Sequence, residues 1–345
     1  MATDMTQQEF NEMLQTAISQ GLFGYYTSAY SNEEMDKAIG MMLGDRPGGP
    51  VGKNLLDNWY FVGGGTSGKF PINHRGQKSY TAVGNTINRW KIPLNGATLA
   101  IQEDGILFTD STGQAPYFPQ ILPLETVIRG REYTFSALFA GGSDTKYAEF
   151  VCYRPGNPGY SVFGGNAVAG AGLASVTFTV PEDTTGIEAR IVTAPWGTPG
   201  NFKAIAAKLE LGSRQTLAYK DESGALRLYE IPDYAGQLAR CQRYAQVITQ
   251  GNQTYFAKTY LDANSINFNI PITATMRKGN PTVDILSNGN IRLFVSGKGD
   301  QEGFTFTAYN CQNLIRLTAS KQNHGITNSD YVFLITSNVL LSLEL

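Results

Sequence analysis

The chain has few charged residues for its length and no long apolar run. Charged residues make up 16% of the 345 residues, and the formal net charge is −2. Without a basic stripe, the sequence offers no electrostatic footprint for nucleic acid. No apolar stretch approaches the length of a membrane span, and residues 1–10 lack the basic start and apolar core of a signal peptide. We therefore expect no nucleic-acid partner, no membrane insertion and synthesis in the cytoplasm.

Cysteine and histidine are equally scarce, which argues against metal or hydrolytic chemistry. The three cysteines, Cys152, Cys241 and Cys311, form no CxxC or Cys/His ligand spacing. The two histidines, His74 and His324, lie in polar loops, and no GxSxG motif is present. Nucleophilic hydrolysis needs a nucleophile, a base and an orienting group, and this sequence offers no such set. We interpret the cysteines as reduced, buried and small apolar residues.

Glycine and aromatic residues are abundant instead, which is typical of β-sandwiches. The chain has 38 glycines and 11% aromatic residues, and apolar residues alternate with polar ones in several short segments. We predict a mainly β fold of two sandwich-like (jelly-roll-like) domains, with short N-terminal helices and one connecting helix. In the first domain, residues 54–213, the alternating sets are Tyr133, Phe135, Ala137 and Phe139; Val176, Phe178 and Val180; and Ile187, Ala189 and Ile191.

The first 43 residues read as two short helices followed by a linker. Thr6 with Glu9 and Ser31 with Glu34 have the spacing of capping boxes, and apolar residues follow each pair at helical spacing. Helices of about three turns are unstable alone in water. We therefore expect residues 1–43 to associate with sister copies or attach to a larger particle; the alternative is a helical hairpin that lies on the first domain. Residues 44–53 are expected to form a linker.

Residues 214–250 read as a connector between the two β domains. Before it, Ile205, Leu209 and Leu211 are predicted on one face of a strand, with Lys208 and Glu210 on the other. Pro232 and Asp233 then predict a helix entry. The apolar positions after this entry have heptad spacing and predict one continuous helical seam: Tyr234, Leu238, Cys241, Ala245 and Ile248.

The last domain, residues 251–345, is predicted to be a second β-sandwich that forms a tip. Asn-Gly in residues 287–290 predicts a hairpin turn. The final stretch alternates apolar residues from Val339 to Leu345, and it pairs either within its own sheet or against another subunit. The other alternating sets are Ile266, Phe268, Ile270 and Ile272, and Phe304, Phe306 and Ala308.

Three stretches together resemble bacteriophage tail-fibre and receptor-binding proteins. The order KLELG, QTLA and PDYAGQLARCQRY within residues 208–244 is similar to a connector in such proteins. Residues 54–61, taken with residues 73–80 and 87–90, and residues 26–39 agree with it. The resemblance implies that residues 54–213 form a carbohydrate-binding-module-like jelly roll. It further implies a homotrimeric virion fibre that binds host-surface carbohydrate, with residues 1–43 attached to other virion proteins.

Two alternatives differ from this interpretation in location or in chemistry. A head-decoration fibre would keep the fold and the glycan adhesion but attach to the capsid. A glycan-cleaving tailspike would need two carboxylates that face each other across a sugar. The adjacent pairs Glu103–Asp104 and Glu182–Asp183 point apart if they lie on strands, so we expect binding without catalysis.

Sugar binding needs an aromatic surface for the ring and polar groups for its hydroxyls. Residues of both kinds occur in Pro- and Gly-rich segments, where they alternatively hold the loops onto the sandwich. Trp59 and Trp90 are assigned to the core. The candidate sugar-binding residues are Tyr117, Tyr153, Arg154, Asn157, Tyr160 and Trp196. The resemblance also implies a structural calcium ion, with oxygen ligands from Asn54, Asp57 and Glu210.

Overall fold

The computed structural model describes residues 51–143, 145–248, 254–311 and 314–343. The chain divides into two compact units, residues 1–51 and residues 52–345. The predicted helices of residues 1–43, and the linker up to residue 50, lie outside the described residues. No helix in the described ranges is long and apolar enough to cross a bilayer.

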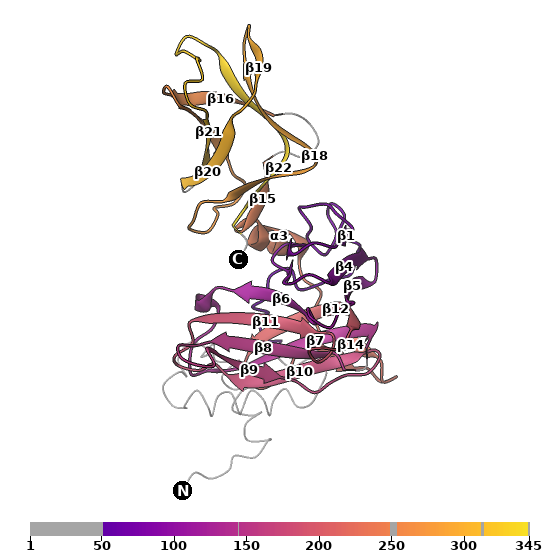
Figure 1. Cartoon of the computed structure of the whole chain (residues 1–345). Helices are drawn as coiled ribbons and strands as arrows, with labels where there is room; N and C mark the ends of the chain where they lie inside the picture. The colour runs from indigo at the N-terminus through magenta and orange to yellow at the C-terminus, as the bar shows by residue number, and fades with distance from the viewer. Residues whose placement is uncertain (1–50, 144, 249–253, 312–313, 344–345) are drawn as a thin grey trace, which may run out of the picture. The chain divides into compact units, whose positions relative to one another are not determined.

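Two antiparallel sheets form the first β part, and their strands interleave along the chain (Figure 1). The six-stranded sheet contains, in order, β1 (Ser79–Tyr80), β4 (Ala97–Gln102), β5 (Gly105–Asp110), β12 (Gly200–Leu211), β7 (Glu132–Gly142) and β10 (Gly172–Thr179). The four-stranded sheet contains β6 (Tyr117–Leu122), β11 (Gly186–Val192), β8 (Tyr147–Tyr153) and β9 (Tyr160–Gly164). Smaller elements are the pairs β2 (Gly84–Asn85) with β3 (Lys91–Ile92) and β13 (Ala218–Lys220) with β14 (Leu226–Leu228), and the 3₁₀ helix η2 (Leu124–Thr126). This arrangement is consistent with the predicted jelly roll.

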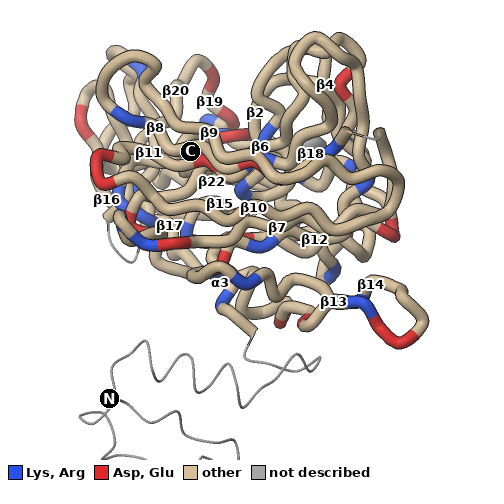
Figure 2. Tube along the Cα trace, turned by 90° about the horizontal axis from the view of Figure 1, so that it is seen from below, with Lys and Arg blue, Asp and Glu red and all other residues tan. Residues whose placement is uncertain are grey.

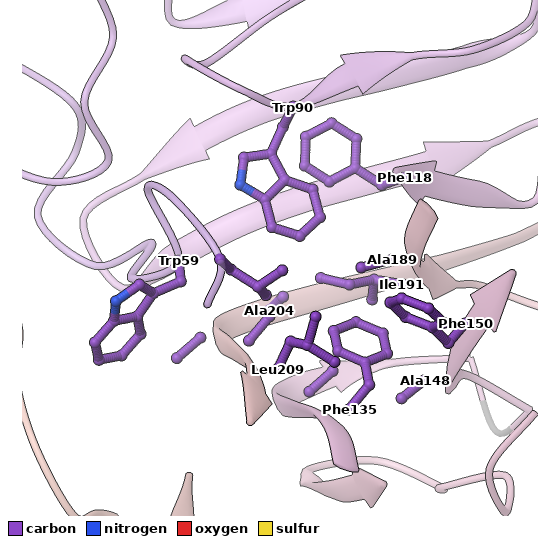
Figure 3. Packing of buried hydrophobic residues seen from close by; sticks show 14 of the residues in the cluster. Trp59, Trp90, Phe118, Phe135, Ala148, Phe150, Ala189, Ile191, Ala204 and Leu209 are labelled. Carbon is purple, nitrogen blue, oxygen red and sulfur yellow. The ribbon is translucent and has the colours of Figure 1, made fainter. Parts of the chain in front are cut away.

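The core lies between the two sheets, where the predicted alternation places apolar side chains (Figure 3). Phe135 of β7 and Phe150 of β8 come from opposite sheets, with ring centroids 6.5 Å apart. Trp90 stacks on Phe118 of β6 at 5.2 Å. Trp59 and Trp90 are 2% and 0% exposed, so their assignment to the core is confirmed. Burial of such aromatic surface is the main stabilising contribution to a sandwich.

At the C-terminal end of β12, Lys208 and Glu210 share one face as predicted, but that face is covered. Lys208 and Glu210 are buried, at 0% and 1% exposure, whereas Leu211 is 59% exposed. The reason is that the chain after β12 folds back over this face. The Lys208 ammonium donates to the hydroxyl and carbonyl oxygens of Thr216 at 2.9 and 3.2 Å and lies 3.4 Å from a Glu230 oxygen. Alternation alone cannot reveal a covering segment from elsewhere in the chain.

The connector contains α3 (Tyr234–Gln242), which begins where the sequence predicts. Asp233 is its N-cap, and the carboxylate accepts hydrogen bonds from the amides of Ala235 and Gly236. The helix ends at Gln242, and β15 (Ala245–Val247) follows. The predicted heptad seam through Ala245 and Ile248 is therefore wrong, because the chain there is extended and pairs with a strand.

The strands of the second β part are hydrogen-bonded in one continuous order of eight and share one apolar cluster. Its apolar cluster contains Ile266, Phe268 and Ile270, as the alternation predicts. In hydrogen-bonding order its strands are β19 (Gly299–Gln301), β18 (Thr282–Val295), β22 (Val332–Ser342), β16 (Thr254–Leu261), β17 (Ser265–Pro271), β21 (Leu314–Ser320) and β20 (Thr305–Cys311), while β15 also pairs with β22.

The structure contradicts one prediction for this part and decides between two alternatives for another. Residues 287–290 form no hairpin turn, because β18 continues through them with a register shift against β22 between Ile285 and Asn290. The last strand is not an apolar stripe left for another subunit. β22 pairs with β18, β16 and β15, and Val339, Leu340 and Leu341 are 0% exposed.

Candidate functional site

The outer face of the four-stranded sheet combines tyrosines with a central charged cluster. Because side chains alternate along a strand, the inward positions of Phe118, Phe150 and Ile191 place their neighbours on the opposite face. We call this the tyrosine face and define it by Tyr117, Tyr147, Glu149, Tyr153, Tyr160, Glu188 and Arg190.

The strand registers order these residues into rows. At one end Val192 lies opposite both Tyr117 of β6 and Tyr147 of β8. In the middle Arg190 lies opposite Glu149. At the other end Tyr153 lies opposite Tyr160 of β9. The tyrosine face therefore has phenol rings at both ends and charged groups between them.

Arg190 links the charged residues at the centre of the tyrosine face. Its Nη1 donates to Glu149 Oε1 at 3.1 Å, and its Nε and Nη2 donate to Glu188 Oε2 at 3.0 and 2.7 Å. The Tyr153 hydroxyl donates to the same Glu188 oxygen at 2.7 Å. The guanidinium carbon lies 4.3 Å from the Tyr117 ring centroid, a cation–π distance.

Each carboxylate retains one oxygen for a ligand. Glu149 Oε2 and Glu188 Oε1 make no hydrogen bond within the described residues, whereas every bonded oxygen faces Arg190 or Tyr153. The Arg190 donors, by contrast, already have partners on the protein. The centre of the tyrosine face thus offers acceptors and few free donors.

Partial burial shifts the proton affinities in this cluster. Burial raises the pKa of Glu149 above its ordinary value, although Arg190 opposes the rise. Burial and the hydrogen bond to Glu188 raise the pKa of Tyr153 to about 12. Burial opposes the charge of Arg190, yet Glu188, Tyr117 and Glu149 raise its pKa above the ordinary value. Arg190 is therefore a permanent cation, and Tyr153 remains neutral at physiological pH.

A hollow of about 450 Å³ lies against this face. Tyr117, Tyr153 and Glu188 line one side, while Lys91 of β3 and Val83 line the other. Burial lowers the pKa of Lys91 and Glu188 opposes the shift. The volume falls within the usual range for small-molecule sites.

Trp196 extends the aromatic surface at the Tyr117 end. Its ring centroid lies 5.8 Å from that of Tyr117, and it is 61% exposed. The loop that bears it is bonded to its neighbour, since the Gly197 amide donates to the Gly113 carbonyl at 2.8 Å. Asp110 in turn accepts from the amides of residues 112, 113 and 115. An exposed indole is thus held on a well-bonded pair of loops.

The remaining predicted sugar-binding residues lie in the turn between β8 and β9. Arg154 forms a bidentate ion pair with Asp183, at 2.7 and 2.9 Å, and Asn157 is exposed. Both residues are next in the chain to the Tyr153–Tyr160 end of the tyrosine face. The structure therefore brings Tyr117, Tyr153 and Tyr160 onto one surface, with Trp196 at one end and this turn at the other.

The set predicted for calcium does not fit a cation. Asn54 Oδ1 accepts from the amides of residues 56 and 209. Asp57 pairs with Arg89 at 3.2 Å and Arg240 at 2.8 Å. Glu210 accepts from the Thr216 amide at 2.6 Å and from its hydroxyl, while burial raises its pKa. These oxygen atoms serve protein donors, and in the described ranges no group of three or more His, Cys, Asp or Glu could hold a metal ion.

The other groups considered for chemistry have structural surroundings. His74 bonds to the Asn88 amide group at 2.9 Å, as expected of a loop histidine. Asp104 and Asp183 are exposed and pair with Lys203 and Arg154. Cys152 and Cys241 are free and buried, but Cys311 is free and exposed, so the prediction of three buried cysteines is wrong for one of them.

Sequence reasoning missed the centre of the face, namely Glu149, Glu188, Arg190 and Tyr147. A signal was present: the apolar alternation of Ile187, Ala189 and Ile191 implies that Glu188 and Arg190 share the opposite face. Which strand lies beside them cannot be read from the alternation.

The chain matches no family model and no curated protein. Among solved structures, it is similar to the CBM22-1–CBM22-2 tandem domain of Paenibacillus barcinonensis Xyn10C, with a TM-score of 0.29, 10% identity and coverage of 86% of this chain and 98% of that chain. It is also similar to the CBM22-1–GH10 modules of Clostridium thermocellum xylanase 10B complexed with xylohexaose (TM-score 0.27, 12% identity, 49% of this chain). The match spans 30% of that xylanase chain. Sulfolobus Turreted Icosahedral Virus gives a TM-score of 0.16 at 11% identity, covering 70% and 58% of the two chains. These scores are too low to assign a function.

Proposed function

We propose that this chain binds an uncharged oligosaccharide on the tyrosine face. The observation that supports it most is the combination of a central Arg190 paired with two carboxylates and tyrosine rings at both ends of one sheet face. Phenol rings offer flat surfaces for the apolar faces of sugar rings, and fixed polar groups between them can orient hydroxyls.

The spacing of the rows suits a ligand of several sugar units. Val192, in the Tyr117–Tyr147 row, and Gly186, opposite Tyr153, mark the two ends of β11. Six residue steps along a strand span roughly 20 Å. A single ring would contact one end only, whereas an oligosaccharide that runs along the strands would contact both.

The charges favour a neutral ligand. Glu149 and Glu188 each keep one oxygen that accepts no hydrogen bond from the described residues, which suits hydroxyl donors. A sugar carboxylate would meet these acceptors without a free guanidinium donor, because Arg190 is committed to the protein. The positive charge of Lys91, on the other side of the hollow, interacts favourably with the negative charge of Glu188.

The same arrangement suits binding rather than cleavage. Arg190 bridges Glu149 and Glu188, so both carboxylates are engaged by one cation instead of facing each other across an open gap. A glycosidase of the usual kind needs one protonated and one ionised carboxyl on opposite sides of the bond. Release of reducing ends from a polysaccharide by the full chain, lost in Glu188→Gln, would contradict this part of the proposal.

The wider role we propose is that of a bacteriophage receptor-binding or tail-fibre protein in the virion. Its support is the resemblance of residues 26–39, 54–61 and 208–244 to such proteins. Many weak sites on a homotrimer would then give attachment through avidity. Burial of β22 in its own sheet removes one argument for that trimer, so its support is the N-terminal sequence pattern alone. A monomeric mass by light scattering at micromolar concentration would contradict it.

A head-decoration fibre with the same glycan site differs only in where it attaches to the virus particle. Imaging of particles labelled at the C-terminus distinguishes the two, since signal on the tails supports the first and signal on the heads supports the second.

Glycan binding is tested with the full chain on neutral and acidic polysaccharides. We expect retention by at least one neutral polysaccharide and weaker retention by polyuronates. Tyr160→Ala should weaken binding about three- to tenfold, from the loss of one stacking surface. Tyr255→Ala is the matched control, since the two tyrosines are 52% and 59% exposed and Tyr255 lies in the other β part. Equal loss in both variants, or no binding to any glycan, would refute the proposal.

A further inference from the structure

A second hollow lies on the other sheet of the first β part, away from the tyrosine face. Its volume is about 940 Å³. Its walls come from the ends of β7 and β10, from Ile205 of β12, and from the β13–β14 hairpin.

The floor of this hollow is aliphatic. Leu138 of β7 and Leu173 of β10 lie directly opposite each other in the sheet register. Together with Ile205 and Leu226 they line the hollow, and Leu173, Ile205 and Leu226 pack only partly against the core. Partly covered aliphatic groups in a concave surface favour an apolar ligand body.

Two tyrosines line the hollow together with these aliphatic residues. Tyr219 of β13 and Tyr229 both line the hollow, and their ring centroids are 4.8 Å apart at an interplanar angle of 51°. Such a tilted pair offers a flat apolar edge with two hydroxyl groups. The lining is thus apolar at depth and polar toward the rim.

The rim carries positive charge without a counter-ion. Arg214 and Lys220 line the hollow and are exposed, and within the described residues neither makes a hydrogen bond or ion pair through its side chain. Of the nearby acids, Asp221 pairs with Arg227 and Glu230 with Lys208, while Glu222 is exposed and does not line the hollow. Figure 2 shows Lys, Arg, Asp and Glu scattered along the trace, with both signs on the β13–β14 hairpin.

We infer that this hollow is a second binding site, for an amphipathic anion. The ligand has an apolar chain or ring that lies on Leu138, Leu173 and Ile205, and an anionic group that Arg214 and Lys220 receive. A carboxylate, sulfate or phosphate fits this rim, because guanidinium and ammonium groups bind such oxygens in charge-assisted hydrogen bonds. The site is independent of the glycan proposal, since it uses another sheet and another ligand chemistry.

The test is calorimetric titration of the full chain with decanoate below its micelle-forming concentration, with decanol as the uncharged counterpart. We expect saturable binding of decanoate and weaker binding of decanol. The double variant Arg214→Gln/Lys220→Gln should weaken decanoate binding about tenfold or more. Arg131→Gln, an exposed arginine outside the hollow, is the control and should leave binding unchanged.

A second variant tests the floor without touching the charges. Leu173→Trp should fill the hollow and abolish binding, while thermal unfolding shows that the sandwich is intact. Absence of saturable decanoate binding, equal affinity for decanol, or unchanged affinity in the double variant would each overturn the inference. Binding of phosphatidylglycerol vesicles but not of free decanoate would also overturn it, because that result indicates a membrane surface rather than a single-molecule site.

Discussion

Removal of the Arg190 charge should destabilise the first β part strongly. The Glu149 and Glu188 side chains are 14% and 5% exposed beside the guanidinium, so Arg190→Leu leaves two nearly buried carboxylates without their cation. Loss of one partner from a buried ion pair costs about 3–5 kcal/mol. Because Glu149 retains some contact with water, we expect the low end, a loss of about 3 kcal/mol in the free energy of unfolding at pH 7.

The assay is urea unfolding of the full chain, followed by the fluorescence of Trp59 and Trp90 in the adjoining core. A triple variant, Arg190→Leu with Glu149→Gln and Glu188→Gln, should recover most of the loss, since it leaves no buried charge. A loss below about 1 kcal/mol in the single variant, or no recovery in the triple variant, would refute the reasoning. Both variants should lose glycan binding, which separates the stability effect from the binding effect.

The loss in Arg190→Leu should also depend on pH in a defined direction. Without the guanidinium, nothing opposes the burial that raises the pKa of Glu149 in the folded state above its value in the unfolded chain. The folded state then binds protons more readily than the unfolded state, so the destabilisation is greatest at high pH and shrinks as the pH falls through the raised folded pKa. Equal destabilisation at acid and neutral pH would contradict this account.

Three further predictions concern single groups. Asp233→Ala removes the N-cap of α3 and should cost about 1 kcal/mol of unfolding free energy by urea titration, with Asp233→Asn nearly neutral as control. Burial raises the pKa of Glu149 in the folded state; its stabilising contribution is therefore present below its unfolded pKa and lost as pH rises through the folded pKa, and Glu149→Gln should flatten the stability–pH curve in that window. Gly113→Ala should lower the melting temperature and the affinity for glycan, because Gly113 has φ +75° and an added Cβ would lie 2.6 Å from the Gly197 backbone; an unchanged melting temperature would contradict it.

The strands of the first β part were predictable because apolar and polar residues alternate along each of them. β7, β10 and β11 coincide with alternating apolar sets, and Trp59 and Trp90 are in the core. The burial of Lys208 and Glu210 in β12 was not predictable, since the segment that covers them, around Thr216, is a tertiary partner. A charged pair on a strand reads as a solvated face until its cover is known.

The site was predictable in its aromatic residues and not in its centre. Tyr117, Tyr153 and Tyr160 stood out as aromatics near turns, and the strand registers place all three on one face. Arg190 and Glu149 are far apart in the sequence, and only the pairing of β11 with β8 brings them opposite each other. Strand order is set by long-range packing, which a local pattern does not encode.

The central claim is that the tyrosine face binds an uncharged oligosaccharide. The most direct test is a chemical-shift titration of the full chain with a neutral tetrasaccharide and with a uronate tetramer, using tyrosine ring and Arg190 side-chain resonances. The account predicts saturable shifts at Tyr117, Tyr153, Tyr160 and Arg190 with the neutral ligand, and much smaller shifts with the uronate. Shifts confined to other residues, or a stronger response to the uronate, would contradict it.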